Sequence, residues 1–466
     1  MFTYNDLLEL GNDEQKRISF ILSAIQEHKQ SELYKWAVDA NAYIRQMNTT
    51  IIDYTKLIYT VKGKTVPDPY SANHKTTSNF YKRFITQELE YLLANGIEFS
   101  SDKVKKQYGK HFDRTTKKLA RAALNGGASY GFWNKDHIDM FDIREFKALP
   151  DEEDGSIKAG IRFWQLAKNK PLRATLYELD GYTEYKQNDK GSLQIFKPKR
   201  AYKLNIVSSE IDGDAIYSGE NYPTFPIVPL FGNDEHQSEL IGLKTEIDAY
   251  DLLKSGFCND LEDVASVYWL LYNSGGMSEE DIGKFLDQLK RLKATCVDDD
   301  GARAEAHTIE VPYNAREVYL TRLENDMYYD AMAMNPKDIT AGNVTATAIR
   351  AAYDNLEHKA NELKGNIEEF IENIAEVAGI EDDKPIFKIN RISNETEYNQ
   401  NVLAAAEYLD HETILKKLTF IEPEEIKGIL ERTAIEQMDM TEPEEGEPNV
   451  QSEESNSEVG ATESGD

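Results

Sequence analysis

A turn-rich segment that runs directly into a long, one-sided helical pattern constrains this chain more than any other feature. Residues 335–343 read Asn-Pro-Lys-Asp-Ile-Thr-Ala-Gly-Asn, residue types that stop helices and favour turns. From Val344 to Ala378 apolar residues recur at steps of four and three, which predicts a helix of about nine turns and roughly 50 Å. The apolar positions are Ile349, Tyr353, Leu356, Ala360, Leu363, Ile367, Phe370, Ile374 and Val377.

The same spacing is a seven-residue repeat, so a coiled coil is an alternative interpretation. A straight helix drifts by about 20° per heptad, and the stripe therefore widens to roughly 80° over the whole pattern, still narrow enough for ordinary packing. The periodicity thus predicts a long one-sided helix and leaves its packing partner open. The residues between the apolar positions are expected to form a solvated face: Glu357, Lys359, Glu362, Lys364, Glu368, Glu369 and Glu372.

Composition narrows the class of protein. The 466 residues suffice for two or three domains, and 83 acidic against 53 basic residues give a net charge of −30. Most of the surface should therefore repel nucleic acid, because binding requires Lys and Arg to replace phosphate counterions. Two cysteines, Cys258 and Cys296, suit a reducing cytoplasm and provide no disulfide framework. No leader peptide and no apolar run of roughly 20 residues is found, so we expect a soluble intracellular protein.

The first half of the chain predicts helices followed by a small antiparallel sheet. Short apolar or aromatic runs between Ala128 and Ser208 are separated by turn signals such as Asp180-Gly181 and Lys190-Gly191, as in β-hairpins. Tyr222–Asn233 is rich in Pro and is expected to be a connector. Helical spacing is found at residues 13–47, 79–94 and 111–124, and residues 60–77 are expected to form a loop.

The second half predicts two helices that flank a compact α/β insert. Ser238 should cap a helix that runs through about Ala265. Asn314, with Glu317 three residues later, predicts a capping box for a second helix that ends before Pro336. The insert is expected to contain strands at 267–271, 294–297 and 307–311 and an amphipathic helix at 278–292.

Beyond the long helix, residues 384–392 should be extended and residues 395–438 should form two or three helices. The final 26 residues, 441–466, carry nine acidic residues, no basic residue and no aromatic residue. Such a composition cannot bury a core, so we expect this tail to be disordered.

Signals for enzymatic chemistry are weak. Gly63-Lys64-Thr65 resembles the end of a phosphate-binding loop, but Ile58 occupies the position where that motif requires Gly. The eight histidines are scattered, and Asp298-Asp299-Asp300 lacks the spacing of a calcium loop. No nucleophile motif such as Gly-x-Ser-x-Gly appears. We therefore expect no enzyme, no catalytic residue, no metal site and no cofactor.

Two groups of basic residues stand out against the acidic composition. For both, a solvated face that balances local acids is the favoured interpretation. The larger group could instead contact an acidic neighbouring subunit. The larger group is Lys103, Lys105, Lys106, Lys110, Arg114, Lys117, Lys118 and Arg121, and the smaller group, on the helix of the insert, is Lys284, Lys290, Arg291 and Lys293.

Several segments, taken in order, carry a family resemblance: Asn79–Lys82 with Tyr91–Leu93, Ala122–Tyr130, Phe225–Asn233, Glu246–Asp251, Ser255–Asp260 and Ile339–Ile349. Together with the helix–insert–helix–loop–long-helix layout, they resemble the portal proteins (head–tail connectors) of tailed bacteriophages, particularly those of siphophages that infect Gram-positive hosts. The resemblance extends over most of the chain. Two mild departures are Thr345, where Ser is commoner, and Gly232, where Asn is common.

The resemblance implies a mixed α/β, mainly helical portal fold, assembled as a ring of typically twelve subunits around a central channel. The implied parts are a wing at residues 1–237 (N-terminal helices plus a small antiparallel sheet), a first stem helix at 238–265, an α/β clip at 266–313, a second stem helix at 314–334, a tunnel loop at 335–343, a long wing helix and return at 344–392, a helical crown at 393–438 and a disordered acidic tail at 439–466.

The implied function is a channel at one capsid vertex for packaging, retention and ejection of double-stranded DNA, with no membrane involved. Implied partners are terminase (the separate ATPase), then head-completion and tail proteins, and the major capsid and scaffolding proteins. The implied location is the portal vertex of the virion, and the host cytoplasm during assembly. Twelve chains would carry a charge of about −360, and an acidic wall would let DNA slide without sticking.

The resemblance also assigns candidate site residues. Lys337 is expected to be the basic residue nearest DNA, and the remaining loop residues should touch the DNA backbone without reading bases. The tunnel-loop residues are Lys337, Asp338, Ile339, Thr340, Ala341, Gly342, Asn343 and Val344; the stem residues are Lys244, Asp248, Asp251, Arg316, Arg322 and Glu324; the clip residues for partner docking are Lys284, Lys290, Arg291 and Lys293.

Two other classes of protein compete with this interpretation. A coiled-coil scaffolding or assembly protein without a DNA channel would form rods or dimers, but it leaves the insert between two capped helices unexplained. A nucleotide-dependent or metal-dependent DNA enzyme would need the motifs that the sequence lacks, and null ATPase and nuclease assays would dismiss it.

The tunnel loop yields a first prediction. Gly342-Asn343 can adopt positive φ and so can act as a hinge, whereas Pro fixes φ near −65°. Gly342→Pro should therefore impair DNA packaging while leaving assembled rings intact, as measured by packaged DNA per particle and by electron microscopy. Normal packaging by this variant would remove the hinge role.

Overall fold

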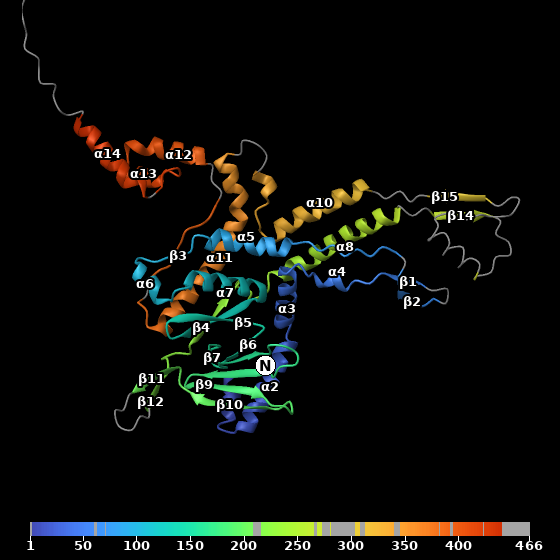
Figure 1. Cartoon of the computed structure of the whole chain (residues 1–466), viewed down its shortest axis with the longest axis horizontal. Coiled ribbons are helices and arrows are strands. Elements are labelled where there is room, and N and C mark those ends of the chain that lie inside the picture. Colours follow the sequence, from blue (N-terminus) through green and yellow to red (C-terminus); the bar gives the residue numbers. More distant parts are fainter. Residues whose placement is uncertain are drawn as a thin grey trace, which may run out of the picture. The chain divides into compact units, whose positions relative to one another are not determined.

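The computed structural model has mixed helix and sheet, and its chain separates into two units (Figure 1). The first unit runs through Arg391 and the second begins at Ile392. The residues that the structure describes are 2–59, 63–69, 71–207, 216–264, 268–272, 280, 303–307, 313–339, 345–381, 383–391, 395–422 and 424–439.

A three-stranded antiparallel sheet lies at the centre of the first unit. Strand β4 (Ala128–Asn134) pairs with β13 (Ile227–Phe231) on one side and with β5 (His137–Asp142) on the other. Helix α7 (Phe112–Gly126) packs on β4 and β5, and helix α11 (Ala346–Ala378) packs mainly on β13. The long helix therefore packs against a strand that lies more than a hundred residues earlier in the sequence.

The two faces of β4 have different partners because successive side chains of a strand point in opposite directions. Ser129 donates to the carbonyl of Leu119 on α7, and Gly131 lies directly against the ring of Phe370 on α11. The opposite face carries Tyr130, whose ring is 4.6 Å from that of Phe146. The alternation therefore puts both helices on one face and an aromatic layer on the other.

A five-stranded antiparallel sheet lies beyond this aromatic layer and has a core of its own. Helices α1 (Tyr4–Glu9) and α2 (Glu14–Gln30) bury Leu7, Phe20, Ile21, Ala24 and Ile25 against it. Its strand order is β10-β9-β8-β7-β6, with β6 (Phe146–Pro150), β7 (Ile157–Trp164), β8 (Arg173–Glu178), β9 (Gly181–Gln187) and β10 (Leu193–Arg200).

The first unit contains further helices and two-stranded pairs besides these sheets. The helices are α3 (Glu32–Ile44), α4 (Thr49–Asp53), α5 (Phe80–Leu93) and α6 (Asp102–Gln107), and the two-stranded pairs are β1 (Leu57–Tyr59) with β2 (Thr65–Pro67), β11 (Lys203–Val207) with β12 (Ile216–Glu220), and β3 (Ile97–Glu98) with β16 (Ile386–Phe387).

Helix α11 rests on two separate hydrophobic clusters. From Leu363 to Val377 its apolar side chains belong to the main core of the unit. Nearer its start, Ile349, Tyr353, Leu356 and Ala360 pack in a smaller cluster with Tyr91 and Met334. The apolar stripe is therefore buried within its own chain and is not available as a coiled-coil seam.

Within the described residues, the second unit contains three short helices and one 3-10 turn. Val402, Ile414 and Leu418 form its small buried cluster. Its elements are α12 (Glu395–Ala404), η2 (Ala405–Glu407), α13 (His411–Lys417) and α14 (Glu425–Asp439). This agrees with the two or three helices predicted there, and the predicted acidic tail lies outside the described residues.

The structure corrects several sequence predictions. The Pro-rich connector contains strand β13, in which Pro229 is tolerated because β13 is an edge strand. The helical stretch 13–47 is broken at Ser31, whose hydroxyl accepts from the amide of Tyr34 and caps α3. The loop at 60–77 includes strand β2, and α1 was not predicted at all.

Gly232 yields a prediction about the connection between β13 and α7. A Cβ atom at this position would lie 2.7 Å from the carbonyl oxygen of Ala123, a backbone atom that cannot move aside easily. Gly232→Ala should therefore lower the free energy of unfolding by about 1–3 kcal/mol, measured by urea titration. The matched control is Gly242→Ala, since Gly242 is an exposed helical residue with open space around it, and this change should stabilise by about 1 kcal/mol. Equal effects at both positions would contradict this packing argument.

Candidate nucleic-acid interface

An antiparallel helix pair and the segment that follows it contain most of the candidate site residues that the structure describes. Helix α8 (Leu240–Val264) and helix α10 (Tyr313–Asp330) lie side by side (Figure 1). Strands β14 (Tyr268–Tyr272) and β15 (Arg303–His307) pair between them in the chain, with Tyr268 opposite His307. Of the predicted strand at 307–311 the structure describes only His307, the last residue of β15, and the predicted helix at 278–292 and strand at 294–297 lie outside the described residues apart from Glu280. Helix α10 begins at Tyr313, so Asn314 lies inside its first turn and not at the cap position.

An extended segment fastens α8 to the body of the first unit. The amides of His74, Thr76 and Ser78 donate to side chains of Asn259, Ser255 and Asp251, at 2.6, 2.9 and 2.8 Å. Two residues of extended chain advance about 6.6 Å, and four residues of helix advance about 6 Å, so the two repeats match. This match lets every second amide of the segment reach one polar side chain per helical turn. The three α8 side chains are buried.

Three of the candidate stem residues take part in this attachment. Asp251 is fully buried, also accepts from the side-chain amide of Asn48, and burial raises its pKa. Lys244 donates to Asp248 and to the hydroxyl of Thr50, both at 3.0 Å. Asp248 in turn accepts from Tyr43. Within one chain these side chains hold α8 to α3 and α4.

The other three candidate stem residues lie on α10 and are more exposed. Arg316 forms an ion pair with Asp260 of α8, and Arg322 lies 3.6 Å from Asp326 on its own helix. Glu324 lies 3.0 Å from Lys337, whose side chain is 60% exposed. Lys337, the residue expected nearest to DNA, is therefore tied to the helix pair while its surface faces solvent.

Carboxylates meet where the base of α8 faces the end of α10. Glu246 lies beside Asp330 and Asp326, and burial together with the charge of Asp330 raises the pKa of Glu246 to about 7. Like charges held close together cannot all ionise without cost. The helix pair thus contains a proton-binding site near neutral pH.

A buried lysine joins the long helix to the end of the helix pair where α8 begins and α10 ends. The amino group of Lys359 on α11 lies 2.6 Å from Glu239, just before α8, and 3.4 Å from Glu88 on α5. It also donates to the carbonyl of Ala331, just after α10, at 3.2 Å. Burial lowers the pKa of Lys359, but the two carboxylates outweigh burial and the net shift is upward. Burial raises the pKa of Glu88 to about 7.

Lys359 was expected on the solvated face of the long helix, and this expectation is wrong. The heptad pattern identifies the apolar side of α11 and says nothing about polar partners on its flanks. Glu362, expected on the same face, accepts from the amide of Asp234 at 2.7 Å. Sequence reasoning also missed Ser255, Asn259 and Glu239, although polar residues at a four-residue spacing, Asp251, Ser255 and Asn259, were a usable signal.

The segment after α10 turns sharply before α11 begins. Met332 has a φ of +52°, and the amide of Ala333 donates to Tyr328, a helix end that usually uses glycine. Pro336–Ile339 then form a 3-10 turn, η1, which includes Lys337, Asp338 and Ile339. Thr345 caps α11 by accepting from the amide of Ala348. The other tunnel-loop candidates, Thr340, Ala341, Gly342, Asn343 and Val344, lie outside the described residues, as do the clip candidates Lys284, Lys290, Arg291 and Lys293.

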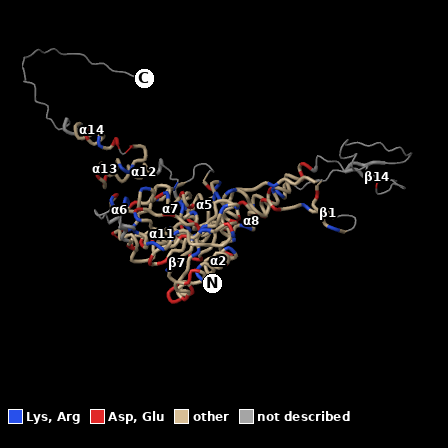
Figure 2. The backbone as a smooth tube through the Cα atoms, turned by 60° about the horizontal axis from the view of Figure 1, so that its bottom comes forward, with Lys and Arg blue, Asp and Glu red and all other residues tan. Residues whose placement is uncertain are grey.

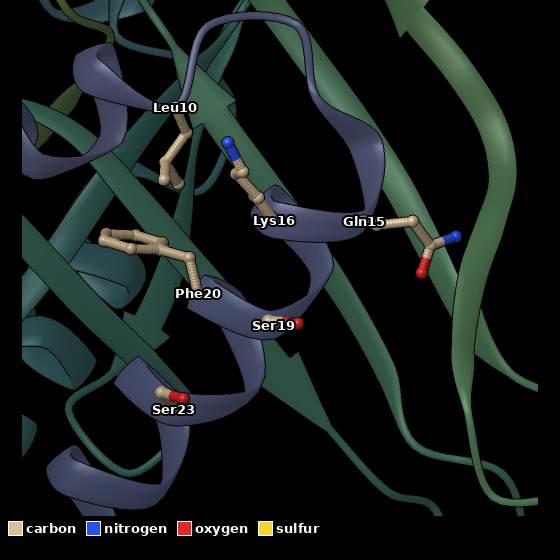
Figure 3. A pocket seen from close by; sticks show the side chains of 6 residues that line it. All are labelled: Leu10, Gln15, Lys16, Ser19, Phe20 and Ser23. Atoms are coloured by element: carbon tan, nitrogen blue, oxygen red, sulfur yellow. The ribbon is translucent and has the colours of Figure 1, made fainter.

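Other kinds of site find little support in the part of the chain that the structure describes. A shallow pocket of about 430 Å³ beside α2 is lined by side chains of mixed character with Lys16 as its one charged group (Figure 3). Among the described residues, no three His, Cys, Asp or Glu side chains are placed to hold a metal ion. Within the same residues, no helix has the length and apolar character needed to cross a membrane.

The chain belongs to the phage portal proteins. A family model described as phage portal protein, SPP1 Gp6-like, matches residues 40–439. This assignment confirms the resemblance inferred from the sequence, including its link to phages of Gram-positive hosts.

Two similar proteins are described as portal proteins. The portal protein of Clostridium phage phiCD119 (strain Clostridium difficile/United States/Govind/2006) is 26% identical over 418 residues, covering 82% of this chain and 88% of its own. The portal protein of Bacillus phage SPP1 is 24% identical over 446 residues, covering 87% and 86%.

Among solved structures, the chain is similar to the neck of a native gene transfer agent particle with C12 symmetry, at a TM-score of 0.41 and 10% identity, over 74% of this chain and 90% of that one. The neck of the empty particle with C6 symmetry gives a TM-score of 0.40 at 10% identity, over 74% and 91%.

Lys359 yields a prediction about stability. Lys359→Met would leave two carboxylates without their cation, and removing one partner of a buried ion pair costs about 3–5 kcal/mol. We expect this loss in the free energy of unfolding at pH 8, and a smaller loss near pH 5.5, where Glu88 binds a proton. The matched control is Lys364→Met, five residues along α11 and 38% exposed, which should change stability by less than about 1 kcal/mol. A Lys359→Met variant as stable as the control would remove this role.

Glu246 yields a prediction about pH. Because its pKa is raised in the folded state, its protonated form stabilises the fold fully at low pH, and that contribution is lost as pH rises from about 4.5 through about 7. Glu246→Gln should therefore raise the midpoint of thermal unfolding at pH 8 and leave it unchanged at pH 4.5. Glu317→Gln, on an exposed acid of α10, is the control and should change neither value. A pH-independent effect of Glu246→Gln would contradict the proton-binding assignment.

Proposed function

We propose that this portal protein forms a ring of about twelve subunits at one capsid vertex and conducts double-stranded DNA through its centre. Packaging, retention and ejection of the genome all use this channel. The observation that carries the proposal is the match of residues 40–439 to the portal family. In this role the chain is not an enzyme: a separate terminase supplies the ATP-driven force.

The domain roles follow the order of elements. Helices α8 and α10 are the stem, the β14–β15 region belongs to the clip, residues 335–343 are the tunnel loop, and α11 crosses the wing. Residues 393–438 are the crown. The clip docks terminase first and the head-completion adaptor afterwards, with Lys284, Lys290, Arg291 and Lys293 as its basic contacts. Capsid and scaffolding proteins surround the wing during assembly in the host cytoplasm.

The surface of the helix pair supports a multisubunit assembly. On α10 alone, Val318 is 69% exposed and Tyr329 is 74% exposed, and Leu252 and Leu261 of α8 are also exposed. Exposed apolar side chains of this size on both helices support surfaces that partners cover. Neighbouring stems in a ring would cover them.

The charge of the chain supports passage without adhesion. Each Lys or Arg that neutralises a phosphate adds salt-dependent affinity, which would slow sliding DNA. Lys337 is held by Glu324, so its contact with DNA would be partly balanced by a nearby carboxylate. Lys337 and its neighbours in the loop are proposed to contact the DNA backbone without reading its sequence.

Electron microscopy with mass determination tests this proposal. The full chain, expressed alone and together with capsid and scaffolding proteins, should form closed rings of about twelve subunits with a central hole. Rods or dimers under both conditions would favour the scaffolding alternative. Monomers under both conditions would also overturn the ring.

A further inference from the structure

A basic stripe on α7 has no acidic partner within the described residues of its own chain. Arg114 and Lys118 are exposed and Arg121 is half-buried, at helical steps of four and three. By contrast, their neighbours Lys105 and Lys117 form ion pairs with Asp113 and Glu90. On a chain of net charge −30, such a stripe indicates a surface that an acidic partner covers.

Helix α11 carries a stripe of the opposite charge. Glu369, Glu372 and Glu376 are exposed, at steps of three and four, and none of them forms an ion pair among the described residues. Their neighbour Glu368, by comparison, lies 3.6 Å from Lys364. Counted from the C-terminal end of α11 toward its N-terminal end, the acidic residues are four and then three positions apart. The basic residues of α7 have the same spacing when counted from its N-terminal end. Two antiparallel helices would therefore pair the stripes in register: Arg114 with Glu376, Lys118 with Glu372 and Arg121 with Glu369.

Neither stripe is explained by the stability of its own helix. A cation near a helix N-terminus and an anion near a helix C-terminus both oppose the helix dipole. Arg114 lies in the first turn of α7, and Glu376 lies in the last turn of α11. Their placement costs each helix some stability, which an external partner of opposite charge would offset.

We propose that these stripes form a contact between neighbouring copies of this chain, with α7 of one subunit antiparallel to α11 of the next. The inference rests on the proposed ring and identifies one contact between its neighbouring subunits. In the proposed ring the α7 stripe of each subunit meets the α11 stripe of the next subunit only, so the contact is heterologous, and repeating it produces a ring when the rotation closes. Helix α7 lies over β4 and β5 while α11 lies mainly over β13, so the stripes belong to opposite ends of one helical layer. Figure 2 shows charges of both signs on these helices.

A second copy fits this surface better than DNA does. DNA would offer phosphates to the basic stripe alone, whereas a second copy covers both stripes, because the spacing of each stripe matches the other. The net charge of −30 also repels DNA from the rest of the chain.

Charge reversal in the full chain tests the contact. One variant is Arg114→Glu with Lys118→Glu and Arg121→Glu, another is Glu369→Lys with Glu372→Lys and Glu376→Lys, and the third combines all six changes. Each triple variant should raise the protein concentration at half-assembly at least tenfold, measured by analytical ultracentrifugation at 0.1 M salt. The combined variant should return it to within about threefold of the starting chain.

The controls distinguish loss of this contact from loss of folding and from a general effect of added negative charge. Arg114→Glu and Glu376→Lys favour the dipoles of their own helices, and the other four changes replace exposed or half-buried charged residues, so the unfolding midpoint should not fall. Lys16→Glu with Lys35→Glu, on exposed lysines of α2 and α3, should leave assembly unchanged.

Three outcomes would contradict the proposed contact. These are triple variants that assemble like the starting chain, a combined variant whose assembly is not restored, or rings that stay intact while the basic triple variant loses binding to a short DNA duplex. The absence of rings from the unsubstituted chain would instead refute the proposed function.

Discussion

The position of the helix pair depends on one buried amino group. Lys359 of α11 contacts Glu239 at the start of α8 and the carbonyl of Ala331 at the end of α10. Through Glu88 it also reaches α5. Since a buried charge is tolerated only when its partners are in place, the three elements are held to one geometry or the site is left with uncompensated charge. The long helix therefore fixes where the chain leaves the body and where it returns.

The attachment of α8 is of a different kind, since it uses hydrogen bonds between an extended segment and a helix. Because two residues of one nearly equal four residues of the other in length, the bonds to Asp251, Ser255 and Asn259 form without distorting either partner. Helix α10 has no comparable strap among the described residues, and its outer turns leave apolar side chains exposed. Helix α8 is thus held to the body of its own chain along several turns. Helix α10 lacks such a series of bonds, and its exposed apolar side chains are available to neighbouring subunits.

Periodicity and turn chemistry in the sequence predicted the long helix and the hairpins. The long helix was expected from Val344 to Ala378 and is found at Ala346–Ala378, and the hairpin at Asp180-Gly181 joins β8 to β9 as expected. Strand β13 was missed because the prolines in and around it suggest a connector. A Pro-rich connector and an edge strand that contains Pro229 cannot be told apart from the sequence. Lys359 was misplaced for a physical reason: whether a lysine between apolar positions meets solvent or two carboxylates depends on segments more than a hundred residues away. The candidate residues Lys244, Asp248 and Asp251 lie on α8, within the helix expected at 238–265, but their contacts with α3 and α4 could not be read from spacing.

The two hydrophobic clusters along α11 have a consequence for how this helix responds to force. Its later turns are embedded in the main core, whereas its first turns rest only on the small cluster with Tyr91 and Met334. Local unfolding starts where buried apolar contacts are fewest, so the helix should fray from its beginning. Ala331 and Lys359, which are 28 positions apart, bound a chain segment that contains both the loop and these first turns. Force applied to the loop would therefore unwind the first turns of α11, and the unwinding would stop at Lys359. The loop could lengthen by the residues released from these turns, while the rest of α11 stays in place.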